Sequence, residues 1–444
     1  MLPLIRIMWP YHPDLLERAV PRYTSFPTAA EFQPMPGESA LPDAIASCDA
    51  EVSLYLHIPF CEQICWYCGC NTGAANKTQR LTAYLDALMH EVSVVAALLP
   101  DRCRVGRIAF GGGSPNAIAP IAFVRLLDRV VTSFSAHEPV ISVELDPRGF
   151  TEEWAQVLGA TGVSHVSLGV QTFESAIQER IGRLQPHQLI EHATGGLRRH
   201  GVRSINYDLM YGLPGQGMAE LDATLAATID LAPERIALFG YAHVPHILPR
   251  QRRIDASDLP DQALRFAMAA HGYETLLAAG YEPVGFDHFA LPHDPMAMAA
   301  RDGTLRRNFQ GFTDDQAERL IGLGASAISI FPDRIIQNEK NAGRYRMRLS
   351  QDQLTGALGV WRSRDDRDRG MVIEDILCGR PTDLSQISGE WPLDGLAPFI
   401  ERGLVSLDGE ALAPTDATRP YARSIAALFD PYRAATPQRF SSAV

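Results

Sequence analysis

Short apolar runs recur along most of the chain, and stretches with helical spacing lie between them. Alternating strands and helices are typical of parallel βα units, so this pattern predicts an α/β fold. Between residues 81 and 99, Leu85, Leu88, Val92 and Val95 fall on one stripe, which predicts a helix packed on the sheet. The runs that we expect to form strands are 53–58, 107–110, 140–145, 164–170, 204–210, 236–241 and 283–286.

Polar residues or glycines stand at the ends of several of these runs. A glycine triplet at 111–113 follows the second run, and Glu144, Gln171 and Asp208 lie at or beside the ends of three others. The carboxyl ends of parallel strands meet at one edge of a sheet, where ligand loops form. The pattern therefore predicts one site assembled from several strand ends.

The two ends of the chain have a different pattern. The segment 21–28 combines polar and aromatic side chains with two prolines, which predicts an ordered arm over a neighbouring surface. Towards the other end, helical patterns near 368–377 and 418–429 flank a hairpin signal at Asp408 and Gly409. We expect three parts: an N-terminal arm at 1–50, a large α/β domain at 51–355 and a small, mainly helical C-terminal domain at 356–444.

The composition describes a soluble globular protein, with 444 residues of which 46% are hydrophobic and 21% charged. No apolar run approaches the length of a membrane span, so we expect no membrane-spanning segment. The formal net charge of −12 argues against nucleic-acid binding, which needs clustered Lys and Arg. Because no apolar secretory leader is present, the sequence predicts a cytoplasmic protein. Separately, we expect a monomer.

Four of the seven cysteines fall within ten residues, at Cys61, Cys65, Cys68 and Cys70. The CxxxCxxC spacing of the first three allows one loop to wrap three thiolates around one iron–sulfur cubane. Three ligands for four irons leave one iron open to another molecule, which favours catalysis over electron storage. We expect the first three cysteines to bind iron and Cys70 not to.

Two other roles for these cysteines remain open. A structural zinc site usually pairs two CxxC knuckles separated by a dozen or more residues, and no second knuckle follows here. A disulfide framework is disfavoured because Cys48, Cys103 and Cys378 are isolated in the sequence.

The CxxxCxxC motif is the signature of the radical S-adenosylmethionine enzymes, which this chain resembles. Its surroundings are similar to those of the oxygen-independent coproporphyrinogen III oxidase family within them: Tyr55 and His57 precede the motif, Tyr67 precedes the third cysteine, and Asn71 closes a Gly-Cys-Asn sequence. The resemblance implies a partial, roughly six-stranded parallel βα barrel that is open on one side, with the arm and the C-terminal domain closing its mouth.

The similarity runs from the Arg-Tyr-Thr-Ser sequence at 22–25 to the Ala-Ile-Ser sequence at 327–329, nearly the whole chain. It implies a [4Fe–4S] cluster on Cys61, Cys65 and Cys68, and two molecules of S-adenosylmethionine. By the resemblance, the residues that contact the cluster-bound molecule are Tyr55, also a catalytic candidate, Gly112, Glu144 and Arg183. Those that line the second site or its border are Tyr67, Gly113, Ser114, Gln171, Asp208, Ala242 and Ile328.

The resemblance also implies a reaction in haem biosynthesis. A 5′-deoxyadenosyl radical would start the decarboxylation of two propionates of coproporphyrinogen III to vinyl groups, giving protoporphyrinogen IX, with an electron donor and an electron acceptor that the sequence does not identify. Arg22, Arg306 and Arg307 are candidate partners for the substrate carboxylates, which suit a guanidinium fork.

Three alternatives remain. A haem-chaperone paralogue typically has Asp-Phe after the third cysteine, where this chain has Gly69 and Cys70. A haem-utilisation radical methyltransferase shares more of the motif. A non-catalytic zinc-binding protein belongs to another class, and iron and sulfide analysis distinguishes it.

Overall fold

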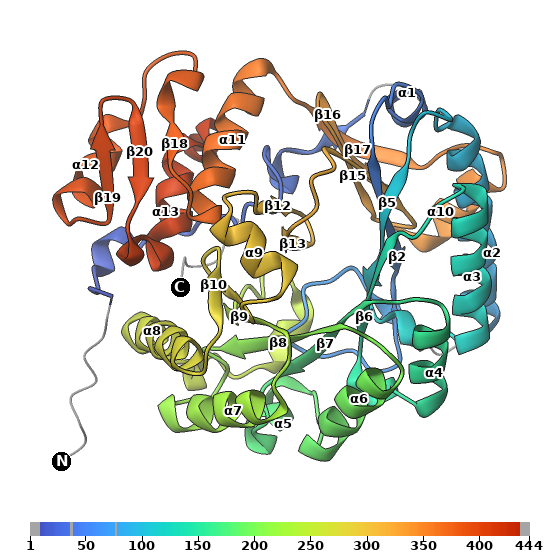
Figure 1. Ribbon diagram of the computed structural model, residues 1–444, viewed down its shortest axis with the longest axis horizontal. Helices are drawn as coiled ribbons and strands as arrows, with labels where there is room; N and C mark the ends of the chain where they lie inside the picture. Colours follow the sequence, from blue (N-terminus) through green and yellow to red (C-terminus); the bar gives the residue numbers. More distant parts are fainter. Residues whose placement is uncertain (1–8, 36–38, 76–77, 436–444) are drawn as a thin grey trace.

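A central set of parallel strands forms the core of the computed structural model, which describes residues 9–35, 39–75 and 78–435 (Figure 1). Neighbours in this set are hydrogen-bonded side by side, all in parallel, as in the expected partial barrel. In spatial order the strands are β14 (Arg319–Leu323), β2 (Val52–Ile58), β5 (Val105–Gly112), β6 (Val140–Leu145), β7 (His165–Gln171), β8 (Ser204–Tyr211) and β9 (Arg235–Gly240).

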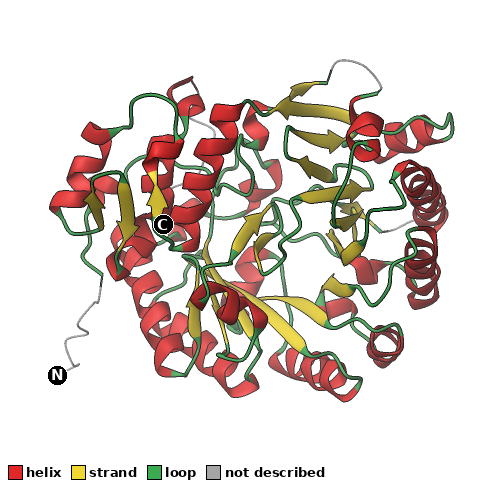
Figure 2. Cartoon of the chain, turned by 45° about the horizontal axis from the view of Figure 1, so that its top comes forward, coloured by secondary structure: helices red, strands yellow, loops and turns green. Residues whose placement is uncertain are grey.

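Helices cover the outer face of these strands (Figures 1 and 2). The predicted stripe of α2 (Thr78–Leu98) is buried, and every residue of β2 is buried as well. Such burial on both faces explains why the strands read as continuous apolar runs. The other helices on this face are α3 (Pro120–Ser133), α4 (Glu152–Ala160), α5 (Ser175–Ile181), α6 (His187–Arg199), α7 (Met218–Leu231) and α8 (Gln262–Ala278).

Antiparallel strands extend the sheet at both ends. Next to β14 lie β15 (Ile328–Phe331), β16 (Arg334–Asn338), β17 (Gly356–Trp361) and β1 (Gln33–Pro34), and next to β9 lie β11 (His288–Ala290) and β10 (Glu282–Val284). The prediction that the run at 283–286 belongs to a parallel unit is therefore wrong, because β10 pairs antiparallel with β11. Only three residues join β10 to β11, too few for the crossover that a parallel pair needs.

The helix α2 is the one described helix that is long and apolar enough to cross a membrane by length and composition. Its buried stripe, however, carries the carboxyl group of Glu91, which accepts hydrogen bonds from the Tyr345 hydroxyl at 2.6 Å, the Gly324 N–H at 2.6 Å and Asn338 Nδ2 at 3.0 Å. Because these partners belong to the barrel and its antiparallel extension, α2 is a core helix of this fold.

The described part of the N-terminal arm begins at Trp9 and includes α1 (Ala40–Ala46). The C-terminal segment lies beside α8 at one side of the barrel (Figure 1). The hairpin of this segment is the one predicted near Asp408. The helix expected at 418–429 is instead the short α13 (Ala422–Ala426) between two 3₁₀ helices. The elements of this segment are α11 (Arg364–Cys378), β18 (Thr382–Asp383), α12 (Leu393–Glu401), β19 (Val405–Asp408), β20 (Ala411–Pro414) and α13 (Ala422–Ala426).

The division into an arm, a barrel and a C-terminal domain stays a prediction. The expected boundary at 356 falls on the first residue of β17, which pairs with β16 inside the large sheet, so α11 is the first helix beyond that sheet. The remaining described elements are β3 (Phe60–Cys61), β4 (Gly73–Ala74), α9 (Pro295–Arg301), β12 (Arg306–Asn308), β13 (Gly311–Thr313) and α10 (Ala342–Leu349).

Candidate active site

The carboxyl ends of β5 to β9 and the loop after β2 surround one pocket of about 470 Å3, which we call the cysteine-loop pocket. The sequence predicted such a site from the polar strand ends. Residues named from the sequence that the structure brings together in its lining are Arg22, Cys61, Cys65, Tyr67, Cys68, Gly112, Gly113, Glu144, Gln171, Arg183, Asp208 and Ala242.

The cysteine loop is held at both ends. The short strands β3 and β4 pair in parallel, and the Trp66 N–H donates to the Ile181 carbonyl at 3.0 Å. Within the loop, the Cys70 N–H donates to Cys68 Sγ at 3.4 Å. A hydrogen bond with the Cys70 side chain lowers the pKa of Cys68 to about 6, which favours its thiolate form.

Two arginine side chains donate hydrogen bonds to the sulfur of Cys65. Arg183 Nη1 lies 3.1 Å and Arg148 Nη2 lies 3.2 Å from Cys65 Sγ. Asp146 binds both guanidinium groups, at 2.6 Å to Arg148 and 3.2 Å to Arg183. N–H donors of this kind stabilise the negative charge of an iron-bound thiolate.

The three cysteine thiolates and the arginine N–H groups beside Cys65 fit an iron–sulfur cluster. Thiolates are the ligands that such clusters use, and each of the three binds a different iron, so the sulfurs need not crowd around one ion. In the described part of the chain, no group of three or more His, Cys, Asp or Glu side chains is gathered tightly enough for a single metal ion.

The glycines at the end of β5 bring bare backbone to the pocket. Gly112 has a φ of +114°, and a Cβ there would lie 2.5 Å from the ring of His57. A Cβ on Gly113 would overlap the backbone of Phe60, closer than side chains approach in proteins. Side chains are therefore excluded here, and a ligand can approach the backbone directly.

Two carboxyl groups face the pocket from β6 and β8. Glu144 is accessible from the pocket and accepts a hydrogen bond from the Gly112 N–H at 3.1 Å, and desolvation by the surrounding protein raises its pKa to about 7. Asp208 accepts hydrogen bonds from Ser167 Oγ at 3.0 Å and from Asn206 Nδ2 at 2.8 Å, and burial also raises its pKa. Carboxyl groups placed in this way can bind the hydroxyl and amino groups of a nucleoside.

An irregularity in β7 directs Gln171 into the same pocket. The register with β8 shifts between Gly169 and Gln171, and Gln171 has a φ of +65°, which is unusual for a residue other than glycine. Arg183 lies beside it and donates to the Gly169 carbonyl at 2.7 Å. The bulge thus places a neutral amide next to a fixed cation.

Three of the residues that the resemblance assigned to the S-adenosylmethionine sites are not in this lining. Tyr55 lies in the barrel interior, with its hydroxyl 3.0 Å from His57 Nδ1. Ser114 accepts a hydrogen bond from the Asp146 N–H at 3.1 Å and so braces the end of β6. Ile328 begins β15, next to β14.

The three candidate substrate arginines have different surroundings. Arg22 reaches the pocket and donates to the Gly240 carbonyl at 2.9 Å. Arg307 donates to the carbonyls of Tyr23 at 3.2 Å and Arg22 at 3.1 Å, so it holds the arm. Arg306 forms an ion pair with Glu374 of α11 at 2.8 Å.

The sequence analysis missed Asp146 and Arg148 as parts of this site. Both follow the strand that carries Glu144, so the rule that strand ends carry ligand groups could have found Asp146. A single arginine without a motif is usually a surface charge, which is why Arg148 gave no signal.

Comparisons with known proteins agree with this geometry. The Radical SAM superfamily matches residues 55–227. The oxygen-independent coproporphyrinogen III oxidase of Bradyrhizobium diazoefficiens is 40% identical over 96% of this chain and 98% of its own, and that of Escherichia coli is 35% identical over 96% of each. The solved structure of the Escherichia coli coproporphyrinogen III oxidase, a radical SAM enzyme, matches with a TM-score of 0.88 at 34% identity and covers 96% of this chain and 99% of that one.

Proposed function

The chain belongs to the oxygen-independent coproporphyrinogen III oxidase family of radical SAM enzymes, and we propose that it converts two propionates of coproporphyrinogen III to vinyl groups, giving protoporphyrinogen IX. The observation that carries this proposal is the full-length similarity, together with three cysteines of a CxxxCxxC loop at the carboxyl ends of the barrel strands.

Cys61, Cys65 and Cys68 would hold a [4Fe–4S] cluster, and the pocket beside them would hold S-adenosylmethionine, whose one-electron reductive cleavage supplies the 5′-deoxyadenosyl radical. The backbone at Gly112 and the carboxyl group of Glu144 would contact the nucleotide nearest the cluster. The pocket extends to Gln171, Asp208 and Ala242, which supports a second molecule there.

Each round of the reaction has a simple balance. The propionate loses one hydrogen atom from its β-carbon and one electron, and its carboxylate leaves as carbon dioxide to give the vinyl group. An electron donor and an electron acceptor are therefore required partners. The protein positions the β-carbon and excludes water. The arm contributes to this exclusion, because its Arg22 lines the pocket.

The two radical SAM alternatives are less well supported. The curated relatives that match this chain over 96% of its length are named as oxidases, and the same name belongs to the solved structure with a TM-score of 0.88. We infer a cytoplasmic monomer that acts on a tetrapyrrole.

The direct test is anaerobic incubation of reconstituted protein with coproporphyrinogen III, S-adenosylmethionine and a reductant, followed by chromatography of the oxidised porphyrins. We expect a tricarboxylate intermediate and then protoporphyrin IX. A Cys65→Ala variant is the control, because it should lack the cluster and yield neither. No porphyrin product from an iron-loaded protein that cleaves S-adenosylmethionine would contradict the proposal, as would methylated or ring-opened products in a parallel incubation with haem in place of coproporphyrinogen III.

A further inference from the structure

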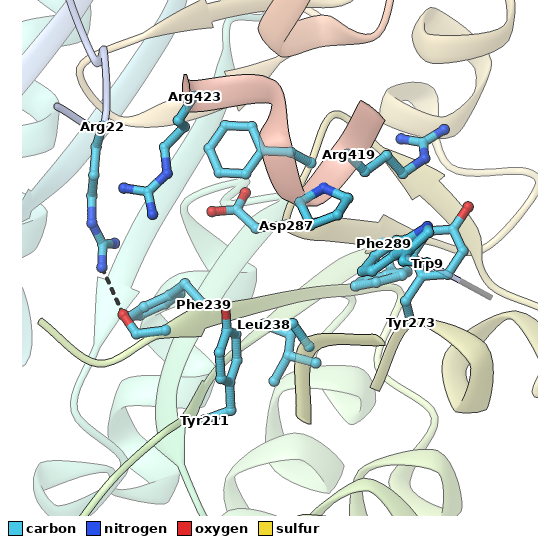
Figure 3. A pocket seen from close by; sticks show the side chains of 14 residues that line it. Trp9, Arg22, Tyr211, Leu238, Phe239, Tyr273, Asp287, Phe289, Arg419 and Arg423 are labelled. Atoms are coloured by element: carbon cyan, nitrogen blue, oxygen red, sulfur yellow. Dashed lines mark hydrogen bonds between the residues drawn. The ribbon is translucent and has the colours of Figure 1, made fainter. Parts of the chain in front are cut away.

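The cysteine-loop pocket is bordered by the N-terminal arm and by the cysteine loop itself. Figure 3 shows the arm side, where Arg22 donates to the Gly240 carbonyl at 2.9 Å and lies over the ring of Phe239. At the cysteine loop the protein is thinner, because Ile64 is exposed next to the buried Cys65. An electron that enters through the outer face of this loop reaches the thiolates without crossing the barrel.

A short segment after β9 is fixed against this loop. Gln251 is buried, and its Nε2 donates to the Tyr67 carbonyl at 2.9 Å. Arg253 lies over the ring of Trp66, 5.9 Å from its centroid. These contacts place the 3₁₀ helix Pro249–Arg253 at the border of the loop that carries the thiolates.

This 3₁₀ helix is strongly basic. Three of its five residues are Arg250, Arg252 and Arg253, and none of the three forms an ion pair with any described residue. Arg252 and Arg253 are exposed. Of the acidic residues that follow, Asp258 is already paired with an arginine of α5, and Asp255 accepts a hydrogen bond from the backbone of the next turn. Positive charge is therefore left over at this border.

Exposed apolar side chains lie beside these arginines. Ile64 of the loop is 37% exposed, and Ile247, just before the 3₁₀ helix, is 49% exposed. Leu184 is 58% exposed and follows Arg183, which reaches the sulfur of Cys65. Apolar side chains gathered within a charged border are typical of a surface that binds another protein. We define the docking face by Ile64, Leu184, Ile247, Arg252 and Arg253.

The charge of the whole chain restricts the partner that fits this face. With a formal net charge of −12, the protein repels an acidic partner over much of its surface and attracts it at the unpaired arginines. The location restricts the partner further. Reduction of a cluster on the loop needs an electron from outside, and the rate of electron tunnelling falls steeply with distance, so the donor must sit over the loop.

We propose that the docking face binds a small acidic electron-carrier protein, which holds a flavin or an iron–sulfur centre and reduces the cluster. In each transfer the carrier's reduced centre loses one electron and the oxidised cluster gains it, and no atom moves between them. This inference rests on the proposed function in taking the cysteine loop as the site of a reducible cluster.

The test uses the cluster-loaded, full-length protein with two acidic probes, a flavodoxin and a low-potential ferredoxin. Calorimetric titration with the oxidised carriers gives dissociation constants, and stopped-flow absorbance with the reduced carriers gives the rate of cluster reduction. We expect the double variant Arg252→Glu and Arg253→Glu to weaken binding of at least one carrier by about 10- to 100-fold at low salt and to slow reduction by a similar factor. High salt should shrink the difference.

Two controls separate docking from other effects. Dithionite needs no docking face, so it should reduce the cluster of every variant to the same extent. Arg203→Glu reverses an exposed charge at the amino end of β8, at the opposite end of the barrel, and should change neither readout. Arg252 makes no hydrogen bond or ion pair with a described residue, so Arg252→Glu alone decides if the double variant fails to load iron.

Binding of neither carrier by the unaltered protein would overturn the proposal, as would equal losses in Arg203→Glu and in the double variant. Unchanged carrier binding in the double variant would also overturn it, and weaker binding of coproporphyrin III in its place would assign the face to the substrate. Failure of the proposed function looks different: no vinyl product would form with any reductant, while a carrier would still reduce the cluster in a manner that depends on the docking face.

Discussion

At the scale of single residues, we predict that three of the four cysteines of the cysteine loop bind iron and that Cys70 does not. Cys61, Cys65 and Cys68 line the pocket with the expected spacing, and Cys70 contributes its N–H to the sulfur of Cys68. We expect Ala at any of the first three positions to abolish the cluster, because each thiolate holds a different iron. Cys70→Ala should keep it, since the backbone donor remains. Iron and sulfide content after anaerobic reconstitution measures this, and an iron-free Cys70 variant would contradict the assignment.

The pair of arginines at Cys65 leads to a second prediction at this scale. A hydrogen bond to a ligand sulfur stabilises the more negative, reduced cluster, so Arg148→Met should lower its reduction potential. A tenfold change in the one-electron equilibrium corresponds to about 60 mV, and we expect a shift of that order. A redox titration followed by electron paramagnetic resonance measures the potential directly. Arg129→Met, which removes the same charge from the exposed face of α3, is the control, and an equal shift in the two variants would refute a local effect.

At the scale of elements, α2 is tied to the sheet by a buried carboxyl group. Burial raises the pKa of Glu91 to about 7 from its usual 4.5, although Tyr345, Gly324 and Asn338 all donate to it. Between these two pKa values the folded protein keeps the proton on Glu91, whereas the unfolded chain has lost it. The contribution of this group to the free energy of unfolding is therefore fully present below pH 4.5, and it is lost as the pH rises to about 7. Over that range the loss amounts to about 3 kcal/mol.

Glu91→Gln removes this titration, so its unfolding free energy should fall less between pH 4.5 and 7 than that of the unaltered protein. Denaturant unfolding at several pH values gives the two curves. Glu144 titrates in the same range and contributes equally to both, so only the difference between the curves belongs to Glu91. Parallel curves would show that Glu91 is ionised in the folded protein.

Elements with a strong local pattern were the ones that the sequence predicted well. The strands near 53–58 and 204–210 and the stripe of α2 are long, buried and periodic, and the structure confirms them. The antiparallel strands β15 to β17 gave no signal, because short strands at the end of a sheet depend on partners far along the chain.

At the scale of the whole molecule, the arm and the C-terminal segment hold each other. Trp9 Nε1 donates to the Asp416 carbonyl at 3.1 Å, and the Tyr23 hydroxyl donates to Asp430 at 3.0 Å. Between Trp9 and Phe26 alone, the arm buries five apolar side chains, those of Trp9, Leu16, Val20, Tyr23 and Phe26. At about 1.5–3 kcal/mol each, their burial matches the stability of a whole domain, so deleting the arm would damage the core as well as any substrate contact.

A smaller change tests the arm without removing it. The buried hydroxyl of Tyr421 donates to the Pro10 carbonyl at 2.6 Å and accepts from the His12 N–H at 2.8 Å, so it fixes the start of the arm to the C-terminal segment. Tyr421→Phe leaves the Pro10 carbonyl and the His12 N–H without this partner. The substitution should lower the free energy of unfolding by about 1–3 kcal/mol. Tyr11→Phe is the matched control, because it removes an exposed hydrogen bond to Gln262 and should cost less than about 1 kcal/mol.

If the arm closes the substrate site, Tyr421→Phe should also raise the KM for coproporphyrinogen III. The rate of S-adenosylmethionine cleavage in the absence of tetrapyrrole should not change, because Tyr421 does not line the cysteine-loop pocket. Thermal unfolding and steady-state kinetics on the two Phe variants measure both effects. A loss of stability without a change in KM would show that the link between the chain ends through Tyr421 is structural only.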